Sequence, residues 1–218
     1  MPISTVLFDM DGLIFDTEGR YKLCWQAAAS EQGFTLDDAF YQGFIGVQDA
    51  QCEQMLLSHF GSRFDLSRFR RERDQQLAAL SNKPVDYKAG FAALFQQLIA
   101  QDYRLALVTS SSLPQVRHHF ADSPWLEKFE VVISAEDIAN GKPAPDCYLL
   151  ATERLGVTPA QCMVLEDSNN GMRAGIAAGC HAVMVPDLLK PDDDVRANAM
   201  AIVSSLLEVP ALLSQANA

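Results

Sequence analysis

The sequence predicts an α/β fold: a doubly wound parallel sheet with a small α-helical cap domain inserted after the first strand. Short apolar runs alternate along the chain with amphipathic helical patterns, and this alternation is typical of right-handed βαβ crossovers. One long interval, from about residue 20 to residue 80, has no convincing strand pattern. We therefore predict a core domain formed by residues 1–16 and 84–218, and a helical cap domain at residues 17–83.

The individual elements follow from the periodicity of the apolar side chains. Strands are expected at residues 6–8, 105–108, 131–133, 163–165 and 182–185, with a weaker edge strand at 199–203. A helix at residues 89–101 would place on one face the side chains of Phe91, Leu94, Phe95, Leu98 and Ile99. The residues after Leu206 are expected to form a terminal helix and a frayed tail.

A cluster of arginines in the cap segment is predicted to form a solvated, salt-bridged helix face, because acidic residues interleave it. The basic residues are Arg63, Arg68, Arg70, Arg71 and Arg73, and the acidic ones are Asp65, Glu72 and Asp74. The alternative is a phosphate-binding patch, which the interleaved acidic residues make the less favoured interpretation.

Composition limits the function classes. The chain has 218 residues and a formal net charge of −11, which argues against binding to nucleic acids or to anionic membranes. No stretch approaches the roughly 20 apolar residues that span a bilayer, and the N-terminus lacks the basic region of a secretory signal. The five scattered cysteines indicate free thiols in a cytoplasmic protein. No long apolar helix face is evident, so we expect a monomer.

Two carboxylates follow the first predicted strand, one residue apart. Asp9 and Asp11 lie at positions i and i+2 of an extended segment, so their side chains point the same way. Burying two neighbouring carboxylates is costly unless a cation compensates them, and hard oxygen ligands suit Mg²⁺. The alternative is an ordinary turn, for which Asp-x-Asp-Gly is also typical.

Polar groups also follow the later strands. Thr109 ends the second strand, and with the backbone N–H of Ser110 at a helix start it forms a natural phosphate clamp. Lys142 lies in a rigid Gly-Lys-Pro loop and is a candidate partner for the same phosphate. The alternatives are a helix N-cap for the hydroxyl cluster and a solvated surface position for the lysine.

The fourth predicted strand ends in Glu166 and Asp167, which would complete a cation site with Asp9 and the Asp11 carbonyl. The alternative is capping of the following helix. Because ligands of parallel sheets bind beyond the carboxyl ends of the strands, all these groups are expected to converge on one site.

In this order and arrangement, the motifs resemble those of the haloacid dehalogenase superfamily. The matching positions are Asp9-x-Asp11-Gly12, Thr109, Lys142 and Glu166-Asp167. The resemblance spans essentially the whole chain and implies a Rossmann-like core. The helical insert looks like the cap of the β-phosphoglucomutase-like branch, and residues 9–18 and 183–187 resemble the sugar- and nucleotide-monophosphate phosphatases of that branch.

The resemblance implies a role for each matching residue. Asp9 would be the nucleophile that forms an aspartyl-phosphate, and Asp11 would act as the general acid and then the general base. Mg²⁺ would bind Asp9, the Asp11 carbonyl and Asp167, with Glu166 in support. Thr109, Ser110 and Lys142 would hold the phosphoryl oxygens of a small phosphorylated metabolite.

Two alternatives to a phosphatase remain: a phosphohexomutase of the β-phosphoglucomutase type, and a non-catalytic binding module. Mutases of this branch carry a histidine early in the cap, where this chain has Tyr21, and basic residues where it has Ile45 and Asp49. An aspartate beside a second phosphate would repel it. The cap residues expected to set specificity are Arg20, Tyr21, Phe44, Ile45 and Gln48.

Overall fold

The computed structural model describes residues 2–81, 85–121 and 123–218. It contains one six-stranded, fully parallel sheet with the strand order β3-β2-β1-β4-β5-β6. The strands are β1 (Thr5–Phe8), β2 (Arg104–Val108), β3 (Val131–Ile133), β4 (Cys162–Glu166), β5 (His181–Met184) and β6 (Ala201–Ile202). The predicted doubly wound fold is therefore confirmed, and the expected edge strand is only two residues long.

Ten α-helices and six short 3-10 helices are found in the described residues. The α-helices are α1 (Glu18–Ser30), α2 (Asp38–Tyr41), α3 (Asp49–Phe60), α4 (Leu66–Ser81), α5 (Phe91–Ala100), α6 (Leu113–His119), α7 (Asp146–Leu155), α8 (Asn169–Ala177), α9 (Asp193–Asn198) and α10 (Val209–Ala216). The 3-10 helices are η1 (Gln42–Phe44), η2 (Gly61–Arg63), η3 (Leu126–Lys128), η4 (Ala135–Asp137), η5 (Pro159–Gln161) and η6 (Leu206–Glu208). No described helix has the length and apolar character needed to cross a membrane.

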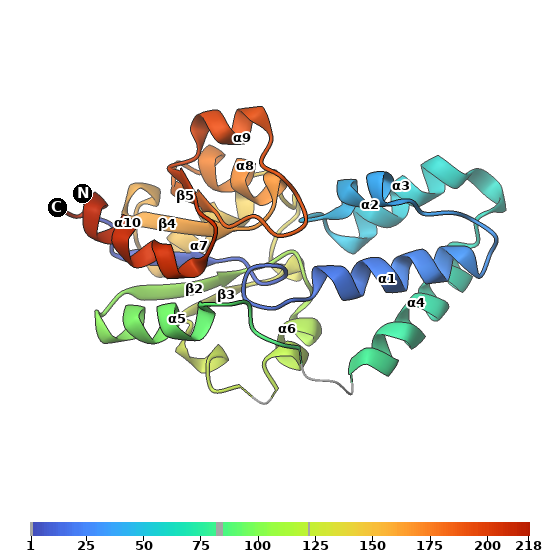
Figure 1. Ribbon diagram of the computed structural model, residues 1–218, viewed down its shortest axis with the longest axis horizontal. Helices are drawn as coiled ribbons and strands as arrows, with labels where there is room; N and C mark the ends of the chain where they lie inside the picture. The colour runs from blue at the N-terminus through green and yellow to red at the C-terminus, as the bar shows by residue number, and fades with distance from the viewer. Residues whose placement is uncertain (1, 82–84, 122) are drawn as a thin grey trace.

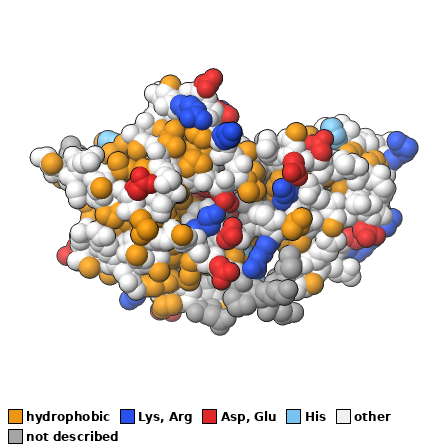
Figure 2. Space-filling view, in the orientation of Figure 1, with side chains coloured by type: hydrophobic (Ala, Val, Ile, Leu, Met, Phe, Trp, Pro, Cys, Tyr) orange, Lys and Arg blue, Asp and Glu red, His pale blue; other side chains and the backbone are white. Residues whose placement is uncertain are grey.

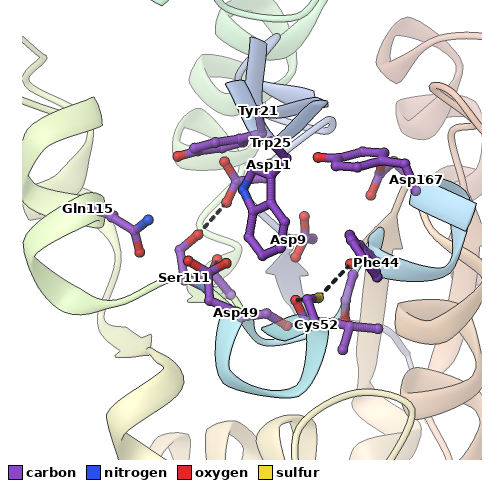
Figure 3. A pocket seen from close by; sticks show the side chains of 15 residues that line it. Asp9, Asp11, Tyr21, Trp25, Phe44, Asp49, Cys52, Ser111, Gln115 and Asp167 are labelled. Carbon is purple, nitrogen blue, oxygen red and sulfur yellow. Dashed lines mark hydrogen bonds between the residues drawn. The ribbon is translucent and has the colours of Figure 1, made fainter. Parts of the chain in front are cut away.

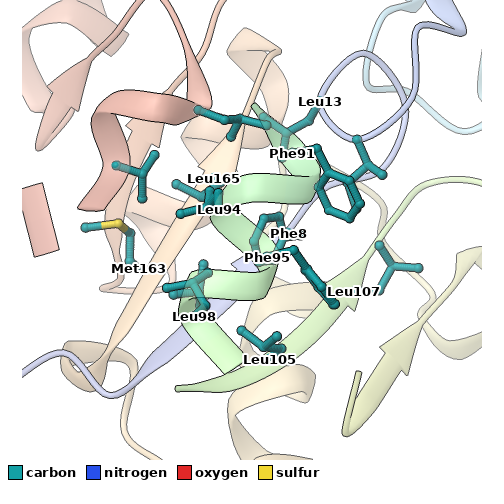
Figure 4. Packing of buried hydrophobic residues seen from close by; sticks show 14 of the residues in the cluster. Phe8, Leu13, Phe91, Leu94, Phe95, Leu98, Leu105, Leu107, Met163 and Leu165 are labelled. Atoms are coloured by element: carbon teal, nitrogen blue, oxygen red, sulfur yellow. The ribbon is translucent and has the colours of Figure 1, made fainter. Parts of the chain in front are cut away.

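Alternating side chains of the central strands build two hydrophobic layers, one on each face of the sheet. Val6 and Phe8 of β1 point into the layer covered by α5, and Leu7 points into the layer that α7 and α8 cover. Figure 4 shows α5 lying over Phe8, whose ring meets those of Phe91 and Phe95 at centroid distances of 6.1 and 5.8 Å. Full burial on both faces explains why these strands are continuously apolar.

Two predictions about the core helices are wrong in detail. The side chain of Ile99 is 37% exposed, because α5 turns it away from the sheet, whereas its four predicted companions are buried. The C-terminal end is not frayed. The Asn217 side chain accepts a hydrogen bond from the Ile3 backbone N–H at 2.7 Å and donates one to the Ile3 carbonyl at 2.9 Å.

Helices α1 to α4 lie beyond the sheet at one end of the molecule (Figure 1) and have a hydrophobic cluster of their own. Trp25 is at its centre, with its ring 5.3 Å from the rings of Phe44 and Phe69. We call these helices the cap and the remainder the core. The predicted boundary between residues 83 and 84 lies outside the described residues, so the domain limits stay a prediction.

Three arginines of α4 form ion pairs, and one of the three departs from its predicted exposure. Arg68 pairs with Glu72 at 2.7 Å and Arg70 with Glu53 at 2.5 Å. The side chain of Arg73 is only 9% exposed and lies inside the cap. The prediction of a solvated face is therefore wrong for Arg73.

Replacing Asn217 by alanine should lower the free energy of unfolding by about 1–3 kcal/mol, because the backbone groups of Ile3 lose both partners. Urea denaturation measures this change. The exposed neighbour Gln215 provides the matched control, since Gln215→Ala should change stability by less than about 0.5 kcal/mol. Equal effects of the two substitutions would contradict an anchoring role for Asn217.

Candidate active site

Asp9 and Asp11 lie at the carboxyl end of β1 and line one pocket (Figure 3). The Asp9 backbone N–H continues the sheet by donating to the Leu165 carbonyl at 3.1 Å. Gly12, with a φ of +80°, then turns the chain sharply, and its N–H donates to the Phe15 carbonyl. The Asp-x-Asp-Gly turn, which the sequence analysis gave as the alternative to a cation site, is therefore formed. It directs both carboxylates toward the same pocket.

Lys142 is buried between two carboxylates. Its Nζ lies 2.5 Å from Asp9 Oδ1 and 2.6 Å from Glu166 Oε1, and it also donates to the Val108 carbonyl at 3.1 Å. Burial lowers the pKa of this ammonium, but the two carboxylates outweigh burial and raise the pKa above its ordinary value. The alternative of a solvated lysine is wrong, since the side chain is 2% exposed.

Glu166 has no exposed surface and is held on several sides. The Tyr148 hydroxyl donates to its Oε1 at 2.7 Å, and the Ser168 hydroxyl donates to its Oε2 at 3.1 Å. Gly171, in the first turn of α8, leaves the space that this carboxylate fills. A Cβ at Gly171 would lie 1.8 Å from Glu166 Oε1. The close approach of α8 to β4 therefore requires glycine at this position.

Asp9, Glu166 and Asp167 form the cluster of carboxylates in the described residues that is suited to a metal ion. One oxygen from each lies within 4.8 Å of the others. All three side chains are buried, and burial raises the pKa of Asp9 well above its ordinary value against the lowering effect of Lys142. Buried carboxylate oxygens at this spacing fit a hard divalent cation such as Mg²⁺. The carboxylate of Asp11 does not belong to this cluster.

The carboxylate of Asp11 is held by two hydroxyls that the sequence analysis did not single out. Thr17 donates to Oδ1 and Ser111 donates to Oδ2, each at 2.7 Å (the Ser111 bond is dashed in Figure 3). The sequence feature that could have indicated this contact is the place of Ser111 in the Thr-Ser-Ser-Ser run after β2. Its neighbour Ser112 instead contacts Gln115 at the start of α6, so the capping alternative holds for that serine.

Thr109 and Ser110 line the same pocket beside the two aspartates. The Thr109 backbone N–H donates to the Ile133 carbonyl at 3.0 Å, and its hydroxyl oxygen accepts from the Ser111 N–H at 3.0 Å. The Ser110 hydroxyl donates to the Gly46 carbonyl of the cap at 3.3 Å. The two hydroxyls therefore share the pocket with Asp9 and are potential donors to an anion there, whereas Lys142 directs its three protons to Asp9, Glu166 and Val108.

The cap closes the pocket through a loop that packs directly on the core. Gly46 has a φ of +74°, and a Cβ there would lie 2.5 Å from Ser168 Oγ. Asn170 Nδ2 donates to the Ile45 carbonyl at 3.5 Å, next to this contact. Figure 2 shows charged side chains gathered in the hollow where the two parts of the molecule meet.

Only two of the five cap residues predicted to set specificity line the pocket, namely Tyr21 and Phe44. Ile45 is buried in the hydrophobic cluster of the cap, and Gln48 Nε2 reaches across to the Ala135 carbonyl at 3.4 Å. Arg20 lines a neighbouring cavity with Leu77 and His118. Ile45, Gln48 and Arg20 thus do not line this pocket, and Ile45 faces the core with its backbone carbonyl instead of its side chain. The role of these residues in specificity stays a prediction.

The structure adds pocket residues from the cap that the sequence analysis missed. They are Trp25, Tyr41, Gly46, Val47 and Cys52. Asp49, which the sequence analysis had considered beside a second phosphate, also lines the pocket. Helical spacing was a usable signal for one of them, since Trp25 lies four residues after Tyr21 and therefore on the same face of α1. The hydroxyl of Tyr21 lies 2.9 Å from His119 Nε2, a contact that joins the cap to α6.

Comparison with known proteins identifies the family. The family model described as haloacid dehalogenase-like hydrolase matches residues 6–185. The chain belongs to this family. It is 31% identical to hexitol phosphatase A of Escherichia coli over 97% of this chain and 94% of that protein. It is also 28% identical to the β-phosphoglucomutase of Bacillus subtilis over 84% of this chain and 83% of that one.

A solved structure supports the same membership in this family of hydrolases. The crystal structure of CbbY from Rhodobacter sphaeroides in complex with phosphate superposes with a TM-score of 0.79 at 25% identity. The match covers 95% of this chain and 96% of that one. The Rossmann-like core and the resemblance derived from the motifs are thus confirmed.

Adding Mg²⁺ should raise the melting temperature of the protein by several degrees, because a ligand at 100 times its Kd stabilises the folded state by about 2.7 kcal/mol. Asp167→Asn should abolish most of this rise, since it removes one carboxylate of the cluster. Thermal unfolding with and without Mg²⁺ measures both effects.

The matched control for this measurement is Asp193→Asn, the same chemical change at an exposed position in the first turn of α9. It should leave the response to Mg²⁺ intact. A rise that survives in the Asp167→Asn protein would show that the cation binds elsewhere.

Proposed function

We propose that the protein is a Mg²⁺-dependent phosphatase that hydrolyses a small phosphomonoester of a sugar, polyol or nucleotide through an aspartyl-phosphate on Asp9. The observation that carries this proposal is the convergence of Asp9 and Asp11 on one pocket, with the hydroxyls of Thr109 and Ser110 beside them and Lys142 bonded to Asp9. Membership in the hydrolase family and the similarity to hexitol phosphatase A support it.

In the first step, a carboxylate oxygen of Asp9 attacks phosphorus, and the bond from phosphorus to the alkoxide oxygen breaks. Asp11 gives a proton to this leaving oxygen. The Ser111 and Thr17 hydroxyls fix the orientation of the Asp11 carboxyl group. Thr109 and Ser110 bind the phosphoryl oxygens, and Lys142 supplies positive charge beside Asp9 while its three protons hold Asp9, Glu166 and the Val108 carbonyl.

In the second step, Asp11 takes a proton from a water molecule that attacks phosphorus, which releases phosphate and restores Asp9. Bound Mg²⁺, held by Asp9 and Asp167, would supply positive charge beside the phosphoryl oxygens. Glu166 bonds Lys142 and Ser168, the N-cap residue of α8, so its proposed role is to hold these groups in place.

A phosphohexomutase is the second candidate, favoured by the similarity to β-phosphoglucomutase. A mutase must retain a sugar that carries two phosphates. Among the described residues that line the pocket, none is a lysine or arginine, and Asp49 adds a carboxylate on the cap side. This charge distribution favours a substrate with a single phosphate and so favours the phosphatase. The monomeric state and the cytoplasmic location stay predictions.

A phosphate-release screen with Mg²⁺ over sugar, polyol and nucleotide monophosphates should find turnover that EDTA abolishes. Asp9→Asn should remove this turnover altogether, because the amide is not a nucleophile. Asp11→Asn should lower kcat by about 10²–10⁴-fold through loss of the general acid and base.

Circular dichroism of each variant provides the folding control for the screen. Isomerisation of β-glucose 1-phosphate without phosphate release would point to the mutase. Turnover that persists in the Asp9→Asn protein would overturn the assigned nucleophile, and the absence of any turnover by the folded wild type would favour a non-catalytic binding module.

A further inference from the structure

Two cysteines lie side by side at the amino-terminal edge of the sheet, which is the end remote from the cap (Figure 1). Cys162 begins β4, and the register of β4 with β5 pairs Met163 with His181, so Cys180 occupies the position beside Cys162. Both side chains belong to the hydrophobic layer that α7 and α8 cover, and they therefore point to the same face of the sheet. Both are free thiols in this structure.

The spacing of the two backbone segments suits a disulfide. Neighbouring strands of a sheet lie about 4.8 Å apart, and disulfides join Cα atoms that are roughly 4.4–6.8 Å apart. Side chains at paired positions of parallel strands project in the same direction. A bond between the sulfur atoms of Cys162 and Cys180 therefore requires rotation of the side chains and little movement of the strands.

The two thiols already interact in the reduced protein. The Cys180 thiol is hydrogen-bonded to the Cys162 sulfur, and the Cys162 thiol donates to the Thr158 carbonyl at 3.5 Å. The bond from Cys180 lowers the pKa of Cys162 more than burial raises it. The hydroxyl of Thr5 and the charge of Arg104 lower this pKa further. Cys162 is therefore the better nucleophile of the pair.

The two cysteines differ in exposure, and this difference divides their roles. Cys162 is buried, whereas Cys180 is partly exposed and follows the turn at Gly179. A small oxidant from solvent thus reaches Cys180 first, and the Cys162 thiol lies beside it to displace the oxidised group. The same hydrogen bond raises the pKa of Cys180, so this thiol stays protonated at neutral pH and requires a strong oxidant such as a peroxide.

We propose that Cys162 and Cys180 form a redox site, which closes to a reversible disulfide when the protein meets hydrogen peroxide. The Cys180 sulfur attacks one oxygen of the peroxide, the O–O bond breaks, water leaves, and Cys180 becomes a sulfenic acid. The Cys162 sulfur then attacks the Cys180 sulfur, the S–O bond breaks, and a second water leaves. The two thiols give two electrons and two protons to the peroxide, and a dithiol reductant reverses the step.

The disulfide would join the two ends of a segment that carries part of the candidate metal cluster. Glu166, Asp167 and the whole of α8 lie between the two cysteines in the chain. Closing this loop restricts the unfolded chain, so oxidation stabilises the folded protein. The active site lies at the opposite edge of the sheet, and the inference does not depend on the proposed phosphatase function.

Peptide mapping of the wild-type protein tests for the bond. The protein is treated with hydrogen peroxide, its remaining thiols are alkylated, and it is digested with trypsin. Residues 155–173 and 174–196 form separate tryptic peptides with one cysteine each, because trypsin does not cleave between Lys190 and Pro191. We expect these two peptides to be joined and to separate after reduction with dithiothreitol. The oxidised protein should also melt several degrees higher than the reduced protein.

Cys180→Ser is the test variant, because its position is partly exposed and the substitution conserves size. It should show neither the joined peptides nor the rise in melting temperature. Cys24→Ala is the matched control, since it removes a buried thiol of α1 in the cap; it should keep both. The oxidised and reduced forms of each variant are compared with one another, so a change in its initial stability does not affect the result.

Three results would overturn the inference. The first is a sulfinic acid on Cys180 while Cys162 remains reduced, and the second is a disulfide from either residue to another cysteine. The third is a rise in melting temperature on oxidation that persists in the Cys180→Ser protein. Joined peptides without any rise in the wild type would overturn the stabilising effect of the bond.

Discussion

The architecture of the site depends on one buried ammonium group. Lys142 bonds Asp9 beyond β1, Glu166 at the end of β4 and the carbonyl of Val108 at the end of β2. These three strands are neighbours in the sheet, in the order β2-β1-β4. A buried lysine without acceptors would be strongly destabilising, and the same holds for the two buried carboxylates. Each charge therefore requires the others, and together they fix three strand ends around the pocket.

This arrangement explains how an acidic protein can offer a site to an anion. The charge of Lys142 is shared between Asp9 and Glu166, so the pocket still holds an excess of carboxylates, including Asp167. Burial already opposes the charged form of Asp9. A divalent cation beside Asp9 and Asp167 would relieve this repulsion and attract phosphate at the same time. The buried carboxylates that repel one another are thus the ones that a metal and a substrate would together stabilise.

The sequence predicted the core part of the site because sheet geometry determines it. In a parallel sheet all strands end at the same edge, so Asp9, Thr109 and Glu166 must lie near one another once the strands are located. The cap residues had no such constraint. A helix pattern shows which side chains are apolar but not which loop atoms turn toward another domain, so it could not show that Ile45 faces the core with its backbone carbonyl. The burial of Arg73 and the anchoring of Asn217 depend on contacts with distant segments, which periodicity does not reveal.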